Sequence, residues 1–308
     1  MRMTELFTRH TGNPVLTAAD WPYQVNTVFN PGVARVDGKT LLLARVEDRA
    51  GVSHLAVATS ADGVTGWQID PQRSLMPALD SEAERFGIED PRITRIGNEW
   101  LIAYSGYSSR GPLVCLAATR DFRTYERRGV ILPPEDKDAA IFPEQIDGRF
   151  AMIHRPFART GDHAHICLCW SPDLVHWAPH GALLRTGEGG SWEEHKVGLG
   201  PPPLRTADGW LLAYHGVKTT ASGAIYRVGL ALLDLERPER VLARTREWVF
   251  GPQAPYERSG DVDNVVFPCG WLLDDDGDTI RMYYGAADTS ICLATASLAA
   301  LLERLRRA

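Results

Sequence analysis

The chain has 308 residues, of which 44% are hydrophobic and 23% are charged, a balance typical of a globular protein and not of a disordered or collagen-like one. Its 33 Lys and Arg residues are outnumbered by 39 Asp and Glu residues, and the net charge of −6 argues against nucleic acid as a partner. No apolar run approaches the roughly 20 residues that span a bilayer, so no membrane association is expected. Residues 1–16 contain neither a continuous apolar stretch nor a small-residue cleavage site, and we therefore expect a cytoplasmic protein.

The cysteines form no disulfide framework. There are five, an odd number, at irregular spacing: Cys115, Cys167, Cys169, Cys269 and Cys292. Four of them lie inside apolar, strand-like runs, so we interpret them as buried apolar side chains in a reducing compartment. No second Cys or His pair has the spacing of a zinc site, and we predict no metal.

A strand-rich pattern recurs along the chain: an apolar run, a tight polar turn that contains Asp, and an aromatic residue. Three clear copies span residues 53–67, 112–125 and 165–177, with the turn residues Asp62, Asp121 and Asp173. A fourth copy spans 226–242 with Asp234, and a fifth spans 289–302, where a closing helix replaces the turn. Repeats of about 50–60 residues with four strands each are typical of a β-propeller. The sequence therefore predicts an all-β fold, a single five-bladed β-propeller domain over residues 1–308 with a short C-terminal helix.

Other strand-like runs lie between these copies, each after a Gly-containing turn: 39–46, 99–106, 149–156, 209–217 and 279–288. Several of them end in polar residues, namely Arg45, His154, Arg155, His215 and Asp288. Because a propeller brings equivalent strand ends to one central funnel, we expect these side chains to form a site. The alternative is that they make hydrogen bonds between blades.

The last residues, 297–308, are expected to form a helix, since Leu298, Leu301, Leu302 and Leu305 follow the i, i+3, i+4, i+7 spacing of one helical face. We expect this face to pack on the last repeat and not on another chain. Whether the protein forms a homo-oligomer is left open by the sequence.

The sharpest local motif is GIEDPRI, residues 87–93. Glu89 and Asp90 are adjacent, so on extended backbone they are expected to face opposite sides. Pro91 favours extended geometry at Asp90 and places Arg92 on the same side as Asp90. A structural ion pair between Asp90 and Arg92 is the alternative to a functional site.

Two further segments are rich in charged groups. Residues 137–156 contain Lys137, Asp138, Glu144, His154 and Arg155, and residues 191–204 contain Trp192, Glu193, Glu194, His195 and Lys196. The second segment is either a solvated loop or a source of a cation and a carboxylate base. Phosphate-binding glycine loops and the GxSxG motif of serine hydrolases are absent from the sequence, whereas isolated carboxylates, cations and many aromatic residues indicate carbohydrate chemistry.

Several motifs, taken in their order along the chain, resemble those of glycoside hydrolase family 130, over roughly Asn30 to Asp288. The matching stretches are GIEDPRI, KDAAIFPE leading to MIHRP, WxxxKVGxGxPP, GWLLxYHGV, and NVVFPCG leading to YYGAAD. The resemblance implies a five-bladed β-propeller and inverting phosphorolysis of β-mannosides to α-mannose 1-phosphate. Hydrolysis by an inverting β-mannosidase is the alternative activity in the same family. The expected partners are a small oligosaccharide and inorganic phosphate as co-substrate, with no other cofactor.

The resemblance also assigns roles. Asp90 matches the family's general acid, which protonates the leaving oxygen through the mannose 3-hydroxyl group. The residues expected to bind phosphate are Arg45, Lys137, Lys196 and His215, although Lys137-Asp138 stands where some members carry Arg-Asn. The residues expected to bind sugar are Asp138, Arg155 and Asp288. In a hydrolase, Glu193 or Glu194 would be the base that activates water.

Overall fold

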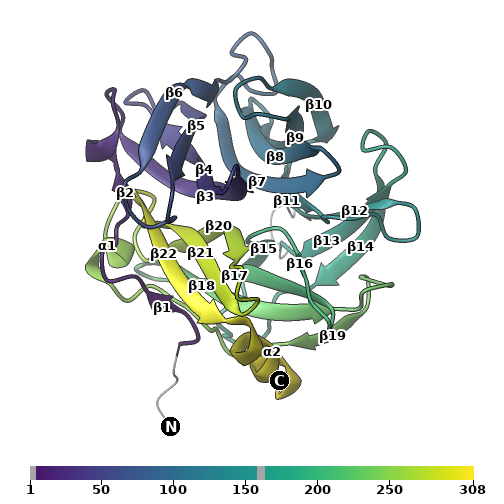
Figure 1. Ribbon diagram of the computed structural model, residues 1–308. Helices are drawn as coiled ribbons and strands as arrows, with labels where there is room; N and C mark the ends of the chain where they lie inside the picture. The colour runs from purple at the N-terminus through teal and green to yellow at the C-terminus, as the bar shows by residue number, and fades with distance from the viewer. Residues whose placement is uncertain (1–4, 158–163) are drawn as a thin grey trace.

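The computed structural model describes residues 5–157 and 164–308. Figure 1 shows five β-sheets arranged around a central axis, which confirms the predicted five-bladed propeller. Blade 1 contains β3 (Thr27–Val36), β4 (Lys39–Glu47), β5 (Ser53–Ser60) and β6 (Gln68–Leu75). Blade 2 contains β7 (Ile88–Ile96), β8 (Glu99–Ser108), β9 (Gly111–Thr119) and β10 (Glu126–Leu132). Blade 3 contains β11 (Asp136–Ile141), β12 (Phe150–Pro156), β13 (Ile166–Ser171) and β14 (Ala178–Leu184).

The last two blades carry additional short strands. Blade 4 contains β15 (Lys196–Leu199), β16 (Leu204–Arg205), β17 (Trp210–Thr220), β18 (Gly223–Leu233) and β19 (Val241–Arg244). Blade 5 contains β20 (Val266–Leu273), β21 (Thr279–Ala286) and β22 (Ser290–Ser297), joined by β1 (Thr8–Arg9) and β2 (Leu16–Thr17). The helical elements are η1 (Ala18–Asp20), α1 (Pro255–Arg258) and α2 (Leu298–Arg306).

The turn aspartates occupy equivalent positions in four blades, as the repeat predicted. In each case Oδ1 accepts hydrogen bonds from the backbone N–H groups two and three residues further on. The acceptors are Asp62, Asp121, Asp173 and Asp234. This short-range bonding is why Asp recurs between the third and fourth strand of these blades.

The N-terminal segment completes the fifth blade, a closure that the repeat pattern did not predict. Strand β1 pairs with β22, so the outermost strand of blade 5 comes from the opposite end of the sequence. Arg9 at the end of β1 contacts the buried Glu257 carboxylate at 2.8 Å, and Glu257 also accepts a 2.7 Å hydrogen bond from Tyr284 of β21. The termini are thereby tied into one sheet.

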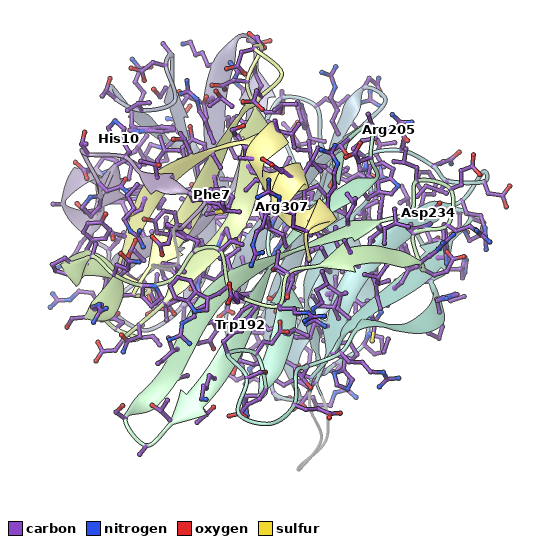
Figure 2. All side chains as sticks on the ribbon, turned by 90° about the horizontal axis from the view of Figure 1, so that it is seen from below. Phe7, His10, Trp192, Arg205, Asp234 and Arg307 are labelled. Carbon is purple, nitrogen blue, oxygen red and sulfur yellow. The ribbon has the colours of Figure 1, made fainter. Side chains whose placement is uncertain are left out.

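Helix α2 packs within the chain, as expected. Leu301, Leu302 and Leu305 are buried in the same apolar cluster as Phe7 of the N-terminal segment, and α2 packs on β18 and β22. Figure 2 shows Phe7 near Arg307, which follows α2. Within residues 5–157 and 164–308, no helix is long and apolar enough to cross a membrane.

The five cysteines are free thiols, and four of them are buried, whereas Cys167 is partly exposed.

Candidate active site

The innermost strands of the first three blades share one irregularity, and it builds the site. The strand register shifts between Phe29 and Gly32 in β3, between Glu89 and Arg92 in β7, and between Lys137 and Ala140 in β11. Inside each bulge one residue has positive φ: Asn30 (45°), Asp90 (51°) and Asp138 (54°). Asn and Asp tolerate this left-handed region better than other side chains with a Cβ. Each bulge therefore carries a short polar side chain at the propeller axis.

Asp90 is almost completely buried and is surrounded by donors from blades 1 and 3. Its Oδ1 accepts a 2.9 Å hydrogen bond from Asn30 and lies 3.3 Å from an Arg45 Nη atom, while Oδ2 lies 3.7 Å from Lys137 Nζ. Burial alone would raise the pKa of Asp90, but Arg45, Lys137 and Arg92 outweigh it and hold the pKa below its usual range.

Glu89 enters the same site, which corrects the expectation that it faces away from Asp90. Its carboxylate lies 3.0 Å from Arg45 and 3.9 Å from Lys137, so both cations contact both neighbouring carboxylates. The bulge at Asp90 interrupts the alternation of an extended strand and turns the two side chains to the same cations. We call Arg45, Glu89, Asp90 and Lys137 the Asp90 cluster.

Arg92 does not form the expected side-chain ion pair with Asp90. It donates instead to the Asp90 backbone carbonyl at 2.9 Å, and to the carbonyls of Leu199 and Gly200 in blade 4. Its guanidinium also lies 3.4 Å from the Asp138 carboxylate. Through these contacts Arg92 connects blade 2, to which it belongs, with blades 3 and 4.

Asp138 is the centre of a second charged group. It is completely buried and contacts Arg155 at 2.7 Å, Arg92 at 3.4 Å and His215 Nε2 at 3.5 Å. Burial would raise the pKa of Asp138, but these neighbours, Arg155 foremost, hold it well below its usual range. We call Arg92, Asp138, Arg155 and His215 the Asp138 cluster. Gly198 of β15 makes room for it, because a Cβ there would collide with both Asp138 and His215.

Several polar atoms of this cluster have no hydrogen-bond partner among the described residues. They are Nη1 of Arg155 and both ring nitrogens of His215, and all three are buried. Burial lowers the pKa of His215 to about 3, so its imidazole is neutral at neutral pH. Lys196 lies beside His215, with its ammonium 5.0 Å from the ring centroid of Tyr226, and it makes no ion pair with a described carboxylate.

Asp288 comes from the end of blade 5, after β21, and has positive φ (53°). Burial raises its pKa to about 7, against the opposing effect of Arg45, and the negative charge of Asp90 raises it further. The structure thus brings this carboxyl group into the electrostatic field of the Asp90 cluster. It carries a proton below about pH 7.

The two carboxylates considered as a hydrolytic base lie elsewhere. Glu193 accepts hydrogen bonds from Tyr214 and Arg244, each at 2.8 Å, in a buried contact of blade 4. Glu194 lines a cavity of about 760 Å³ with His165 and His195. Among the described residues, neither carboxylate has an ion pair or hydrogen bond with Asp90 or its partners.

His154, at another strand end, bonds to Asp136 at 2.7 Å and belongs to neither cluster.

Five blades thus deliver the expected residues to the funnel: Arg45, Asp90, Lys137, Asp138, Arg155, Lys196, His215 and Asp288. Sequence reasoning missed Asn30 and the inward position of Glu89. Asn30 and Asp90 are each followed by proline, and this shared Asx-Pro sequence could have predicted that the two residues occupy equivalent bulges in blades 1 and 2. In the described part of the chain, no group of three or more His, Cys, Asp or Glu side chains is arranged to hold a metal ion.

Comparisons with known proteins point to one family. A family model described as beta-1,4-mannooligosaccharide phosphorylase, of glycoside hydrolase family 130, matches residues 4–307. A 1,2-beta-oligomannan phosphorylase of a Thermoanaerobacter species is 36% identical, with 93% of this chain and 95% of the relative covered. A beta-1,4-mannooligosaccharide phosphorylase of Ruminococcus albus is 32% identical, with 93% and 87% covered.

Solved structures match over nearly the whole length. The beta-1,2-mannobiose phosphorylase of Listeria innocua, in complex with beta-1,2-mannobiose, superposes with a TM-score of 0.90 at 32% identity, covering 98% of this chain and 99% of that one. A second structure, from the glycoside hydrolases of this family that target beta-1,2 mannosidic linkages in Candida mannan, has a TM-score of 0.84 at 26% identity and covers 96% of this chain and 95% of that one.

Proposed function

The chain belongs to glycoside hydrolase family 130, and from that premise we propose that it is an inverting phosphorylase of β-mannosides that releases α-mannose 1-phosphate. The substrates are a small β-linked manno-oligosaccharide and inorganic phosphate, and no further cofactor is required. Because the family model spans residues 4–307, we propose that the whole propeller acts as one catalytic domain.

Asp90 is the proposed general acid. In the assignment that the family resemblance implies, its proton reaches the glycosidic oxygen through the 3-hydroxyl group of the mannose. A deeply buried carboxyl group at the axis, fixed by Asn30 and Arg45, is suited to bind one hydroxyl group in one orientation. Asp288, protonated below about pH 7, is proposed to donate a hydrogen bond to another sugar hydroxyl.

The observation that carries the phosphorylase proposal is the set of donors without partners around Asp138. Arg155 Nη1 and the His215 ring nitrogens are buried with no hydrogen-bond partner among the described residues, although His215 Nε2 lies 3.5 Å from Asp138, and the neutral imidazole can donate from one of its nitrogens. Lys196 lies beside them and pairs with no described carboxylate. Buried donors are normally satisfied, so this set is suited to an anion that arrives with the substrate. Arg45 and Lys137, in contrast, already contact Glu89 and Asp90. We therefore propose that Arg155, Lys196 and His215 bind most of the phosphate, and that Arg45 and Lys137 mainly hold the acid.

Hydrolysis is the alternative within the family, and it needs a second carboxylate to activate water. Glu193 is engaged by Tyr214 and Arg244, and Glu194 lines a separate cavity, so neither is placed as a base beside the Asp90 cluster. The two carboxylates expected as a hydrolytic base therefore do not lie beside Asp90, whereas phosphate, as an anion, needs no base.

The test is to incubate the protein with β-1,2- and β-1,4-mannobiose, each with and without inorganic phosphate, and to identify the sugar products. We expect mannose 1-phosphate only when phosphate is present, and the preferred disaccharide reports the linkage. Release of free mannose at the same rate with and without phosphate would replace this proposal by the hydrolase.

A further inference from the structure

The positions of the two clusters determine the side from which the leaving saccharide departs. In an inverting displacement, the nucleophile attacks the face of the sugar carbon opposite the leaving group. The anion donors Arg155, Lys196 and His215 belong to blades 3 and 4. Asp90 belongs to blade 2, and its closest partners, Asn30 and Arg45, belong to blade 1, with Lys137 of blade 3 more distant at 3.7 Å. The leaving saccharide therefore departs over the rim of blades 1 and 2. This step rests on the proposed function.

The rim on that side carries exposed apolar side chains. They come from the connection between β6 and β7 and from the end of β8: Met76 (55% exposed), Leu79 (58%), Phe86 (47%) and Tyr107 (42%). Of the nine large hydrophobic side chains that are exposed in the described residues, three thus lie in this connection and a fourth, Tyr107, lies at the end of β8. An exposed apolar group of this kind commonly marks a binding surface.

This surface continues directly from the acid. Phe86 N–H donates to the Tyr107 carbonyl and Tyr107 N–H donates to the Gly87 carbonyl, each at 3.0 Å, extending the ladder in which Glu89 pairs with Ser105. Since side chains alternate along β8, Tyr107 lies on the same face as Ser105, one step outward from the pair with Glu89. Tyr107 therefore lies two residues along β8 from the residue that pairs with Glu89, the neighbour of Asp90.

The connection is fixed by a buried carboxylate. Glu84 is 4% exposed and accepts hydrogen bonds from Ala78 N–H and the Tyr104 hydroxyl, each at 2.7 Å, and also from Arg127. Arg127 donates in addition to the Met76 carbonyl. The exposed side chains therefore project from a preorganised backbone, which lowers the entropic cost of binding a ligand.

We propose that Met76, Leu79, Phe86 and Tyr107 form a platform that binds the leaving saccharide, the sugar residues beyond the cleaved linkage. Aromatic rings bind flat apolar surfaces, and the C–H face of a pyranose ring is such a surface, while its hydroxyl groups remain in water. The platform makes no contact with the phosphate donors, so it acts on saccharide affinity alone.

The reverse reaction allows binding at the platform to be measured separately. In that direction the acceptor saccharide occupies the leaving-group side of the site, and α-mannose 1-phosphate occupies the side with Asp90 and the phosphate donors. In Phe86→Ala and Tyr107→Ala we expect the KM for the acceptor to rise about tenfold and the KM for mannose 1-phosphate to change less than about twofold. Val175→Ala is the matched control, because Val175 is 61% exposed in the turn after β13, at the other end of the strands. It is expected to leave both constants unchanged.

Equal changes in both constants, or none in either, would overturn the platform. A loss of oligomeric state in Phe86→Ala, seen by sedimentation with the acceptor KM unchanged, would assign the surface to a second copy of the chain instead. If the wild type forms no mannose 1-phosphate, the proposed function fails separately. Calorimetric titration with manno-oligosaccharide then decides the platform, with weaker binding by Phe86→Ala supporting it and equal binding refuting it.

Discussion

Replacing Lys196 with alanine tests the anion site directly, because in the described part of the chain this residue has no ion pair to lose. It lies at the start of β15, its ammonium is placed over the Tyr226 ring, and no carboxylate of residues 5–157 or 164–308 pairs with it. Lys196→Ala is therefore expected to leave the fold intact. Its effect should fall on the phosphate that we propose binds between Lys196, His215 and Arg155.

The magnitude follows from the strength of one charged contact. Two unit charges about 4 Å apart interact by about 4 kcal/mol at an effective dielectric constant near 20, and the phosphate loses hydration on binding. The net contribution of a hydrogen bond to a charged group is about 1.5–3 kcal/mol. With about 1.4 kcal/mol for each factor of ten, we expect the KM for phosphate to rise about 10- to 100-fold.

The assay measures initial rates of mannose 1-phosphate formation at varied phosphate and fixed saturating saccharide, and then the reverse. The KM for the saccharide should stay within about threefold. Lys218→Ala is the matched control, because Lys218 is on the adjoining strand β17 but donates to the Gly190 carbonyl and not to the cluster. An unchanged phosphate KM in Lys196→Ala, or an equal rise in Lys218→Ala, would refute the proposed anion site.

Three further outcomes are expected. Asp90→Asn keeps the shape and removes the transferable proton, so kcat should fall about 10²- to 10⁴-fold while circular dichroism shows the fold retained. A fall of only a few-fold would exclude Asp90 as the acid. Because burial raises the pKa of Asp288 to about 7, its carboxyl group carries a proton below that pH and loses it above. In the wild type, the KM for the saccharide should therefore rise as the pH increases through 7. In Asp288→Asn the KM should not rise, because the amide donates a hydrogen bond at every pH. Asp138→Asn leaves Arg92 and Arg155 buried without their carboxylate, so the free energy of unfolding measured by urea titration should fall by about 3–5 kcal/mol. Asp147→Asn is the control, because the Asp147 side chain is 88% exposed, and it should change the free energy of unfolding by less than about 0.5 kcal/mol.

The blades were predictable from the sequence because their turns are determined locally. Asp62, Asp121 and Asp173 bond to backbone groups two and three residues away, and such contacts are visible as a repeated motif. The closing strand β1 was not predictable, since it has two residues and its stability comes from β22 and Glu257, both far away in the sequence.

The contents of the funnel were predictable from strand ends and family motifs, but their pairing was not. Alternation along an extended strand separates Glu89 from Asp90, and the bulge that overrides it depends on one residue with positive φ. Likewise, the sequence suggests an ion pair between Asp90 and Arg92, whereas the folded chain directs Arg92 to backbone carbonyls of blade 4. Contacts across blades are long-range, and no local pattern contains them.

If phosphate binds beside the Asp138 cluster as proposed, the charges of the funnel couple its binding to protonation of Asp90. In the free protein, Arg45, Lys137 and Arg92 hold the pKa of Asp90 below its usual range, so the carboxyl group is ionised at neutral pH and has no proton to give. A phosphate anion beside the Asp138 cluster adds negative charge to the same low-dielectric funnel, which weakens the effect of those cations and raises the pKa of Asp90. The coupling is reciprocal, so protonation of Asp90 also strengthens phosphate binding. On the proposed assignment, we expect Asp90 to take up a proton more readily when phosphate is bound, which disfavours loss of the sugar to water.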